Sequence, residues 1–214
     1  MVSLQQVEIP GYSAALKREA EVRETAWLNG NEIVAGIEVR PLNLGTVILL
    51  ERARNGFLVP CRFDNGQEVV AHAIQVLYFS RPEFRVPQLS DLGFLSRLFE
   101  SVRRQRFIDR IARKADYDAL VREVREWLDD AFMDCPSGSS DGVNTPSHAA
   151  SPAYVLDLLA AGGYQFSAEQ IMAMPLRRLW QMMRLASRRL YGSAISNPSD
   201  DVVVKYLGAK SGPN

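Results

Sequence analysis

The chain has 214 residues, with 25 Lys and Arg against 25 Asp and Glu, so its formal net charge is zero. That balance argues against a protein whose main role is to coat nucleic acid, because such proteins carry a clear basic excess, although it leaves room for a local basic patch. Hydrophobic residues make up 47% of the chain, which is enough for a folded core.

Residues 1–36 are predicted to form an N-terminal arm and hairpin. Ser13 to Thr25 is rich in Ala, Glu, Lys and Arg, which favour a helix, but its apolar positions are few. We therefore expect a solvated helix or a loosely docked arm. Asn29-Gly30 is a turn signal between short apolar stretches and favours a small hairpin.

Residues 37–135 are predicted to form a helical body, since apolar residues recur there at helical spacing. The expected helices are Leu44–Arg54, Val69–Phe79, Ser90–Ala115 and Tyr117–Phe132. Asn55-Gly56 supplies a C-terminal stop for the first of them. The positions expected inside are Leu44, Val47, Ile48, Leu50, Ala53, Val69, Ala73, Val76, Leu77, Phe79, Leu92, Leu95, Leu98, Phe99, Val102, Ile108, Leu120, Val121, Val124, Trp127 and Leu128.

The last two of these helices carry opposite charges on their polar faces. Phe94 to Lys114 contains seven basic and two acidic side chains, whereas Asp116 to Asp134 contains seven acidic and two basic ones. Opposite charges on consecutive helices favour an antiparallel pair with the charges meeting at its rim.

Residues 136–152 are rich in Ser, Gly and Pro and poor in apolar side chains, so they are predicted to be a flexible linker. They separate the body from a C-terminal helical module, residues 153–192, or else form only a long loop. In the module, Gly162-Gly163 ends a first helix and Ser167 opens a second through a capping box with Gln170.

A third helix of the module follows Pro175, which suits a first helical turn. Its predicted buried stripe is Leu176, Leu179, Trp180, Met183, Ala186, Ser187 and Leu190. Residues 193–214 are expected to be a tail with one last short helix, Asp200 to Leu207. The sequence thus predicts an all-α, multi-helix bundle with a small N-terminal β-hairpin.

The number of cysteines and the length of the apolar runs indicate the cellular compartment in which the protein is expected. Cys61 and Cys135 are too few for a secreted disulfide scaffold, and the first residues lack the features of a signal peptide. The best apolar run, Thr46 to Leu50, is far shorter than the ~20 residues of a membrane helix. We therefore expect a cytoplasmic protein with no membrane partner.

Motifs of enzymes and cofactor sites are missing from the sequence. It contains no phosphate-binding or dinucleotide-binding glycine loop, and neither GxSxG nor HExxH. Cys61 with His72 could form a nucleophile pair, but no local signature supports it. The carboxylates Asp129, Asp130 and Asp134 could bind a metal or transfer protons, although such a charge run is more typical of a solvated face. We expect no catalytic, cofactor or metal site.

Two predicted helices carry arginine-rich faces that could grip phosphate. These arginines are Arg103, Arg104, Arg106 and Arg110 on one helix, and Arg177, Arg178, Arg184, Arg188 and Arg189 on the other. Aromatic partners for stacking on bases are few there, only Phe107 and Tyr191. The pattern therefore favours a solvated or protein-pairing surface over nucleic acid.

Three passages together resemble phage tail assembly chaperones, the helical proteins that accompany tail-tube and tape-measure subunits before assembly. The first is VRPLNLGTVILLERARNGFLV, Val39 to Val59. The second is VVAHAIQVLYFSRPEF, Val69 to Phe84, which is similar to the family's helix ending in Ser-x-Pro-x-Phe. The third lies between Tyr154 and Leu190, with a Gly-Tyr turn, an Ile-x-x-x-Pro-Leu step and a Trp-bearing, Arg-rich helix.

The resemblance implies a non-enzymatic protein of the host cell cytoplasm that masks apolar surface on tail-tube or tape-measure subunits and needs no cofactor. It places partner binding on the last helix of the module. The expected partner-binding residues are Trp180, Met183, Tyr191, Arg177, Arg184 and Arg188. Self-association is a further expectation, since the near-neutral charge gives little repulsion. Alternatives are a small nucleic-acid-binding regulator, a virion component, or an enzyme of unknown type.

Overall fold

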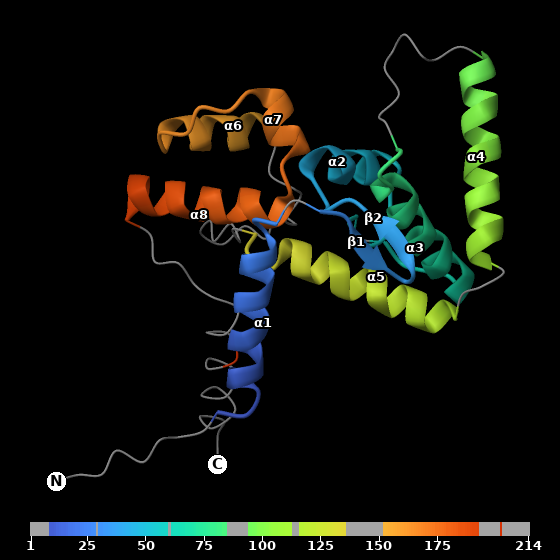
Figure 1. The fold of residues 1–214 in the computed structure, drawn as a ribbon, viewed down its shortest axis with the longest axis horizontal. Helices are drawn as coiled ribbons and strands as arrows, with labels where there is room; N and C mark the ends of the chain where they lie inside the picture. Colours follow the sequence, from blue (N-terminus) through green and yellow to red (C-terminus); the bar gives the residue numbers. More distant parts are fainter. Residues whose placement is uncertain are drawn as a thin grey trace.

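The computed structural model describes residues 9–28, 30–59, 61–84, 94–112, 116–135, 152–192 and 202. Over these residues the protein is mostly helical, with a two-stranded antiparallel hairpin near the N-terminus (Figure 1). The elements are α1 (Tyr12–Thr25), β1 (Glu32–Val34), β2 (Ile37–Val39), α2 (Leu44–Arg52), α3 (Gly66–Ser80), α4 (Phe94–Ala112), α5 (Tyr117–Phe132), α6 (Pro152–Ala161), α7 (Ala168–Ala173) and α8 (Leu176–Tyr191). The predicted all-α fold with an N-terminal hairpin is confirmed.

The hairpin lies a few residues later than its turn signal predicted. Strand β1 pairs with β2 so that Ile33 faces Glu38, and the turn consists of Ala35 and Gly36, both with positive φ. Gly36 suits this conformation, but alanine rarely adopts it, so Ala35 gives no sequence signal for the first position of the turn. A tertiary contact stabilises it instead, because the Ala35 backbone N–H donates to the Glu123 carboxylate of α5 over 2.7 Å.

The C-terminal end of α2 also differs from the prediction, which placed the helix stop at Asn55-Gly56. The left-handed residue there is Arg54, with φ 52°, rather than a glycine. Asn55 is completely buried, and its amide group donates to the backbone carbonyl of His72 and to the Gln75 side chain of α3, at 3.0 and 2.8 Å. Asn55 and Gly56 therefore connect the end of α2 to α3 through hydrogen bonds.

Helix α3 is the centre of the body, because α5, α2 and α4 all pack on it. The predicted pairing of α4 with α5 through their charged faces is wrong. Helix α4 meets α3 through Phe107 and Ile111, and Phe107 lies edge-on to Tyr78 at 5.5 Å. Among the described residues no ion pair joins α4 to α5.

Most predicted core positions of α2, α3 and α5 are buried, and Ile48, Val69, Phe79 and Val121 are half-buried. Ala53 is exposed, and Val102 of α4 is 41% exposed. The side chains of Leu95, Leu98 and Phe99, and all of Leu92, lie outside the described residues, as does the linker up to residue 151. Of the predicted last helix, only Val202 is described, and it is helical.

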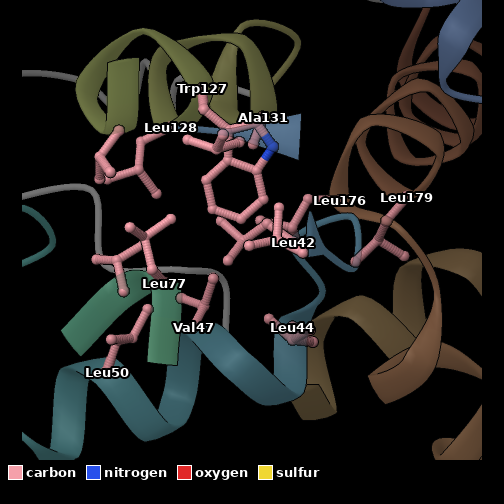
Figure 2. Close-up of a cluster of buried hydrophobic side chains, with 14 of the residues drawn as sticks. Leu42, Leu44, Val47, Leu50, Leu77, Trp127, Leu128, Ala131, Leu176 and Leu179 are labelled. Atoms are coloured by element: carbon pink, nitrogen blue, oxygen red, sulfur yellow. The ribbon is translucent and has the colours of Figure 1, made fainter. Parts of the chain in front are cut away.

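The C-terminal helices share one hydrophobic core with the body (Figure 2). Leu176 at the start of α8 donates its backbone N–H to the Leu42 carbonyl over 2.7 Å, and Pro175 forms a β-bridge with Asn43. Leu176 and Leu179 reach the cluster that Leu42 and α2 form with α5 (Figure 2). The cluster therefore joins α8 to the body.

Candidate binding surface

Two of the apolar residues expected to contact a partner lie in the protein's core. Trp180 is 0% exposed and Met183 1% exposed, so neither can touch a partner while the protein is folded. Trp180 packs near Phe132 of α5, with ring centroids 6.3 Å apart. The side chain of Tyr191 lies outside the described residues. The expectation of an exposed apolar surface on α8 is therefore wrong for Trp180 and Met183, which belong to its buried stripe.

The arginines of α8 mostly bind other parts of the same chain. Arg177 pairs with Glu32 of β1 at 3.0 Å, and Arg178 stacks over the Trp27 ring at 4.9 Å. Arg189 donates to the Gly162 carbonyl over 3.2 Å. Of the three arginines expected to bind a partner, only Arg188 is exposed. The arginines of α8 are thus largely engaged in intramolecular contacts.

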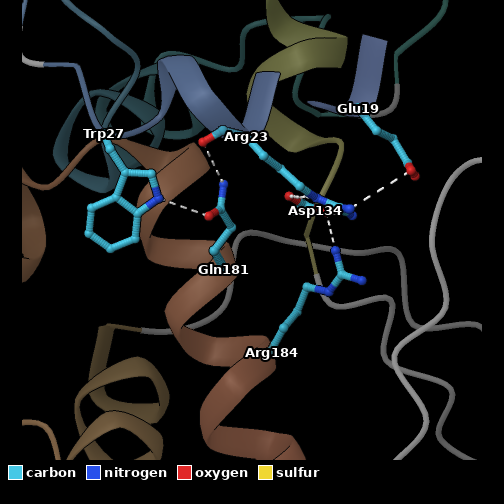
Figure 3. Close-up of polar contacts among 6 residues, drawn as sticks. All are labelled: Glu19, Arg23, Trp27, Asp134, Gln181 and Arg184. Carbon is cyan, nitrogen blue, oxygen red and sulfur yellow. Dashed lines mark hydrogen bonds and ion pairs between the residues drawn. The ribbon is translucent and has the colours of Figure 1, made fainter. Parts of the chain in front are cut away.

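Asp134, just after α5, is the centre of a network of ion pairs that includes Arg184 of α8 (Figure 3). Asp134 is 5% exposed, and its carboxylate accepts hydrogen bonds from Arg23 of α1, at 2.8 and 3.1 Å, and from Arg184 of α8. The hydrogen bond to Asp134 raises the pKa of Arg23, whereas burial lowers the pKa of Arg184. Glu19 lies 3.8 Å from Arg23. The prediction of a solvated acidic face is wrong at Asp134, which ties α1, α5 and α8 together.

The neighbouring residues of α1 extend this contact. Arg18 pairs with Asp130 of α5 at 2.7 Å, on the surface. Trp27 donates its indole N–H to the Gln181 amide oxygen over 3.1 Å (Figure 3). Only Val22 and Ala26 of this segment are buried apolar residues. The N-terminal helix is therefore docked largely by charged and polar groups.

An open groove of about 630 Å³ lies between α3, α4 and the start of α5. Its apolar and aromatic lining consists of Val70, Ala71, Ile74, Tyr78, Phe79, Ile108 and Tyr117. Gly66, Gln67, Gln75, Arg104 and Asp118 complete the lining. A concave, mainly apolar surface with a few polar groups is the usual form of a binding site.

The charged residues of the groove lie at its opposite ends. Helices α3 and α4 run antiparallel, and the start of α5 lies beside the C-terminal end of α4 (Figure 1). Asp118, in the first turn of α5, therefore marks one end. Arg104 lies two turns back along α4 and marks the other end, where Arg81 covers Tyr78 and Phe107 at 4.1 and 4.9 Å. The groove is basic at one end and acidic at the other.

Three further arginines of α4 whose side chains are described, Arg103, Arg106 and Arg110, face away from the groove. At 100° per residue, Arg103, Arg106 and Arg110 lie roughly 140–200° around the helix from Ile108, which lines the groove. Phe107, the aromatic residue expected beside these arginines, is buried against α3 and cannot stack on a base. The α4 arginine stripe is therefore a surface distinct from the groove.

The suspected nucleophile pair is engaged in the packing of the α2–α3 loop. His72 accepts a hydrogen bond at Nδ1 from the Gly56 backbone over 3.3 Å, and Phe63 lies edge-on to its ring. Cys61 is exposed, whereas burial raises the pKa of the Cys135 thiol to about 11. Across the described residues, no group of three His, Cys, Asp or Glu could hold a metal ion.

Comparison with known proteins identifies no relative. No protein-family model, curated protein or solved structure matches the chain. No helix among the described residues is both long and apolar enough to cross a membrane.

Proposed function

We propose that the chain is a non-enzymatic protein that holds another polypeptide, in the manner of phage tail assembly chaperones. The observation that carries the proposal is the open, mainly apolar groove between α3, α4 and α5. The three passages that resemble those chaperones support it, and two of them, Val39–Val59 and Val69–Phe84, build α2 and α3. The proposed clients are tail-tube or tape-measure subunits.

A groove of this kind holds a client by removing apolar side chains from water. Each buried Leu, Ile or Phe side chain contributes roughly 1.5–3 kcal/mol. Three or four of them give about 4.5–12 kcal/mol, from which the cost of association, at least about 4 kcal/mol, and the cost of ordering the client are subtracted. The expected complex is therefore micromolar or weaker. Such an affinity protects a subunit from aggregation and still allows its release to a tighter partner during assembly.

Co-expression tests this function. The full chain is produced together with the tape-measure protein, and separately with the tail-tube subunit, encoded by the same phage or prophage. We expect the soluble yield of at least one client to rise several-fold and the two chains to co-purify. If both subunits are equally soluble with and without the chain, the proposed function is wrong.

A matched pair of variants on α4 locates the binding surface. Ile108 is half-buried in the groove, while Val102 is exposed on another side of the same helix. Ile108→Asp should remove the gain in client solubility, and Val102→Asp should leave it intact. Thermal unfolding followed by circular dichroism shows whether each variant is folded. Equal loss in both folded variants would place the client elsewhere.

The α4 arginine stripe supports a second candidate, a nucleic-acid-binding regulator. Three arginines on one face could neutralise about three phosphates, which gives a slope of log affinity against log salt near −3 for duplex DNA and near −2 for a single strand. Electrophoretic mobility shifts with a duplex DNA and a single-stranded RNA, over a series of salt concentrations, measure that slope. Absence of binding at low salt eliminates this candidate.

A further inference from the structure

We propose that the groove between α3, α4 and α5 takes a short amphipathic helix of the partner polypeptide in one direction, with its N-terminus at Asp118 and its C-terminus at Arg104. The inference rests on the proposed function and specifies what the client presents. The partner helix would place its apolar face in the groove, an acidic residue beside Arg104 and a basic residue beside Asp118.

The length of the groove fits such a helix. From Arg104 to the end of α4 at Ala112 is eight residues, or about 12 Å along the axis. The anchors of a helix bound in a groove recur at i, i+3, i+4 and i+7, a span of roughly 10.5 Å. One such set of anchors therefore covers the groove from its basic end to its acidic end.

The charges at the two ends determine the direction. A helix carries a partial positive charge at its N-terminus and a partial negative charge at its C-terminus. Asp118 at one end is exposed and favours the N-terminus of the bound helix. Arg104 is exposed at the other end, with Arg81 nearby, and favours the C-terminus. The bound helix would run parallel to α3 and antiparallel to α4.

The same features disfavour nucleic acid in this groove. Its lining is mainly aliphatic and aromatic, with one arginine at one end and, at the opposite end, one carboxylate that would repel phosphate. The α4 arginine stripe, which suits phosphate better, points away from it. An amphipathic helix uses both the apolar lining and the two opposite charges.

Two synthetic peptides test the direction. Each is a fluorescein-labelled 14-residue (about four turns) helix with leucines at i, i+3, i+4 and i+7 and a hydrocarbon staple on its outer face, so that helicity is the same in both. The first has lysines in its first turn and glutamates in its last turn, and the second has these charges exchanged. Fluorescence anisotropy with the full chain measures both dissociation constants.

We expect the first peptide to bind about fivefold tighter than the second. The second peptide can keep both charge pairs only by binding in the reverse direction, which sets its dipole against Asp118 and Arg104, at a typical cost of about 0.3–1 kcal/mol at each end. The double variant with Arg104→Asp and Asp118→Arg should prefer the second peptide by a similar factor. An inverted preference cannot arise from a loss of folding. Ile108→Asp should weaken both peptides at least tenfold, while Val102→Asp should weaken neither.

Three results would overturn the inference. The first is equal affinity for both peptides in the wild type. The second is a preference that the charge exchange leaves unchanged. The third is self-association, measured by sedimentation velocity, that Ile108→Asp abolishes, because the groove would then hold a second copy of this chain.

Failure of the inference is distinguishable from failure of the proposed function. Direction-dependent peptide binding without any gain in tail-subunit solubility would retain the inference and reject the chaperone role. A gain in solubility that Ile108→Asp removes, with no preference between the peptides, would retain the chaperone role and reject the direction.

Discussion

Replacement of Trp180 by alanine tests whether α8 is part of the core or a docking surface. The side chain is fully buried. A buried tryptophan removes ~150–250 Å² from water, which at ~25 cal/mol per Å² corresponds to about 4–6 kcal/mol as an upper estimate. Aromatic-to-alanine changes in cores cost about 3–5 kcal/mol. Since domains are stable by only about 5–15 kcal/mol, Trp180→Ala should bring the protein close to unfolding.

Trp27 supplies the matched control, because the same substitution removes a side chain that is 51% exposed. Roughly half the area is involved and no closed cavity forms, so Trp27→Ala should cost at most about 2–3 kcal/mol. Urea unfolding followed by far-UV circular dichroism measures both changes. If Trp180→Ala costs no more than Trp27→Ala, or keeps full stability and loses only client binding, the assignment of Trp180 to the core is wrong.

Trp180→Phe separates the packing contribution of the Trp180 ring from the free-energy cost of its buried indole N–H. The Nε1 of Trp180 is buried without a hydrogen-bond partner among the described residues. Such an unpaired donor costs about 1–3 kcal/mol. Trp180→Phe removes this donor while retaining most of the ring, so its stability should lie within about 1–2 kcal/mol of the wild type. A loss as large as that of alanine would mean that a partner of Nε1 exists in solution.

Two further predictions concern buried polar groups. Asp134→Ala leaves two arginines without their shared carboxylate, so it should lower the free energy of unfolding in urea by about 3–5 kcal/mol. Asp130→Ala removes a surface ion pair and should lower it by less than about 1 kcal/mol. Equal losses of stability would contradict the role of Asp134. With a raised pKa of about 11, Cys135 is roughly 0.1% thiolate at pH 8, against about a quarter for an ordinary thiol of pKa ~8.5. Ellman's reagent should therefore modify the exposed Cys61 first and Cys135 more than a hundredfold more slowly, with the Cys135 rate rising as the pH approaches 11. Because burial raises the pKa of Cys135, its contribution to stability is intact below the pKa of the unfolded thiol, ~8.5, and is lost as the pH rises through about 11. Equal rates in the folded protein would contradict the burial of Cys135.

Local signals in the sequence predicted the helices well. The capping box at Ser167 forms as expected, with the Ser167 hydroxyl accepting from the Gln170 backbone at 3.2 Å and the Gln170 side chain accepting from the Ser167 backbone at 2.9 Å. Gly163 takes the left-handed conformation, with φ 87°, just after α6. These features depend on residues three or four positions apart, so the sequence alone specifies them.

Close approaches between helices were beyond such signals. Gly162 was predicted only as a helix end, yet a Cβ there would lie 2.6 Å from the Cβ of Ala186 in α8. The requirement for glycine comes from the proximity of α6 and α8. A glycine pair after a helix looks the same in the sequence whether or not another helix lies against it.

The sequence does not indicate the groove, for a related reason. It predicts Val69–Phe79 and Ser90–Ala115 as helices with apolar faces, and we expect those faces to lie wholly in the core. Helix α4 meets α3 along Phe107 and Ile111, and this leaves Ile108 and Val70 beside an open space. Helical periodicity shows which side of a helix is apolar, and it does not show how much of that side a neighbour covers.

What the sequence determined by itself is therefore the set of helices, most of their ends and the apolar stripe of α8 as far as Ala186, because each depends on nearby residues and on the 3.6-residue period. The prediction that Leu190 is buried is wrong, because this residue of the last turn is 39% exposed. Only the tertiary structure decided which charges meet. Asp134 binds Arg23, 111 residues before it, and Arg184, 50 residues after it, rather than the basic face of α4 next to it in the chain. Side-chain charges act across space, and the neighbours in space follow from how the apolar faces pack.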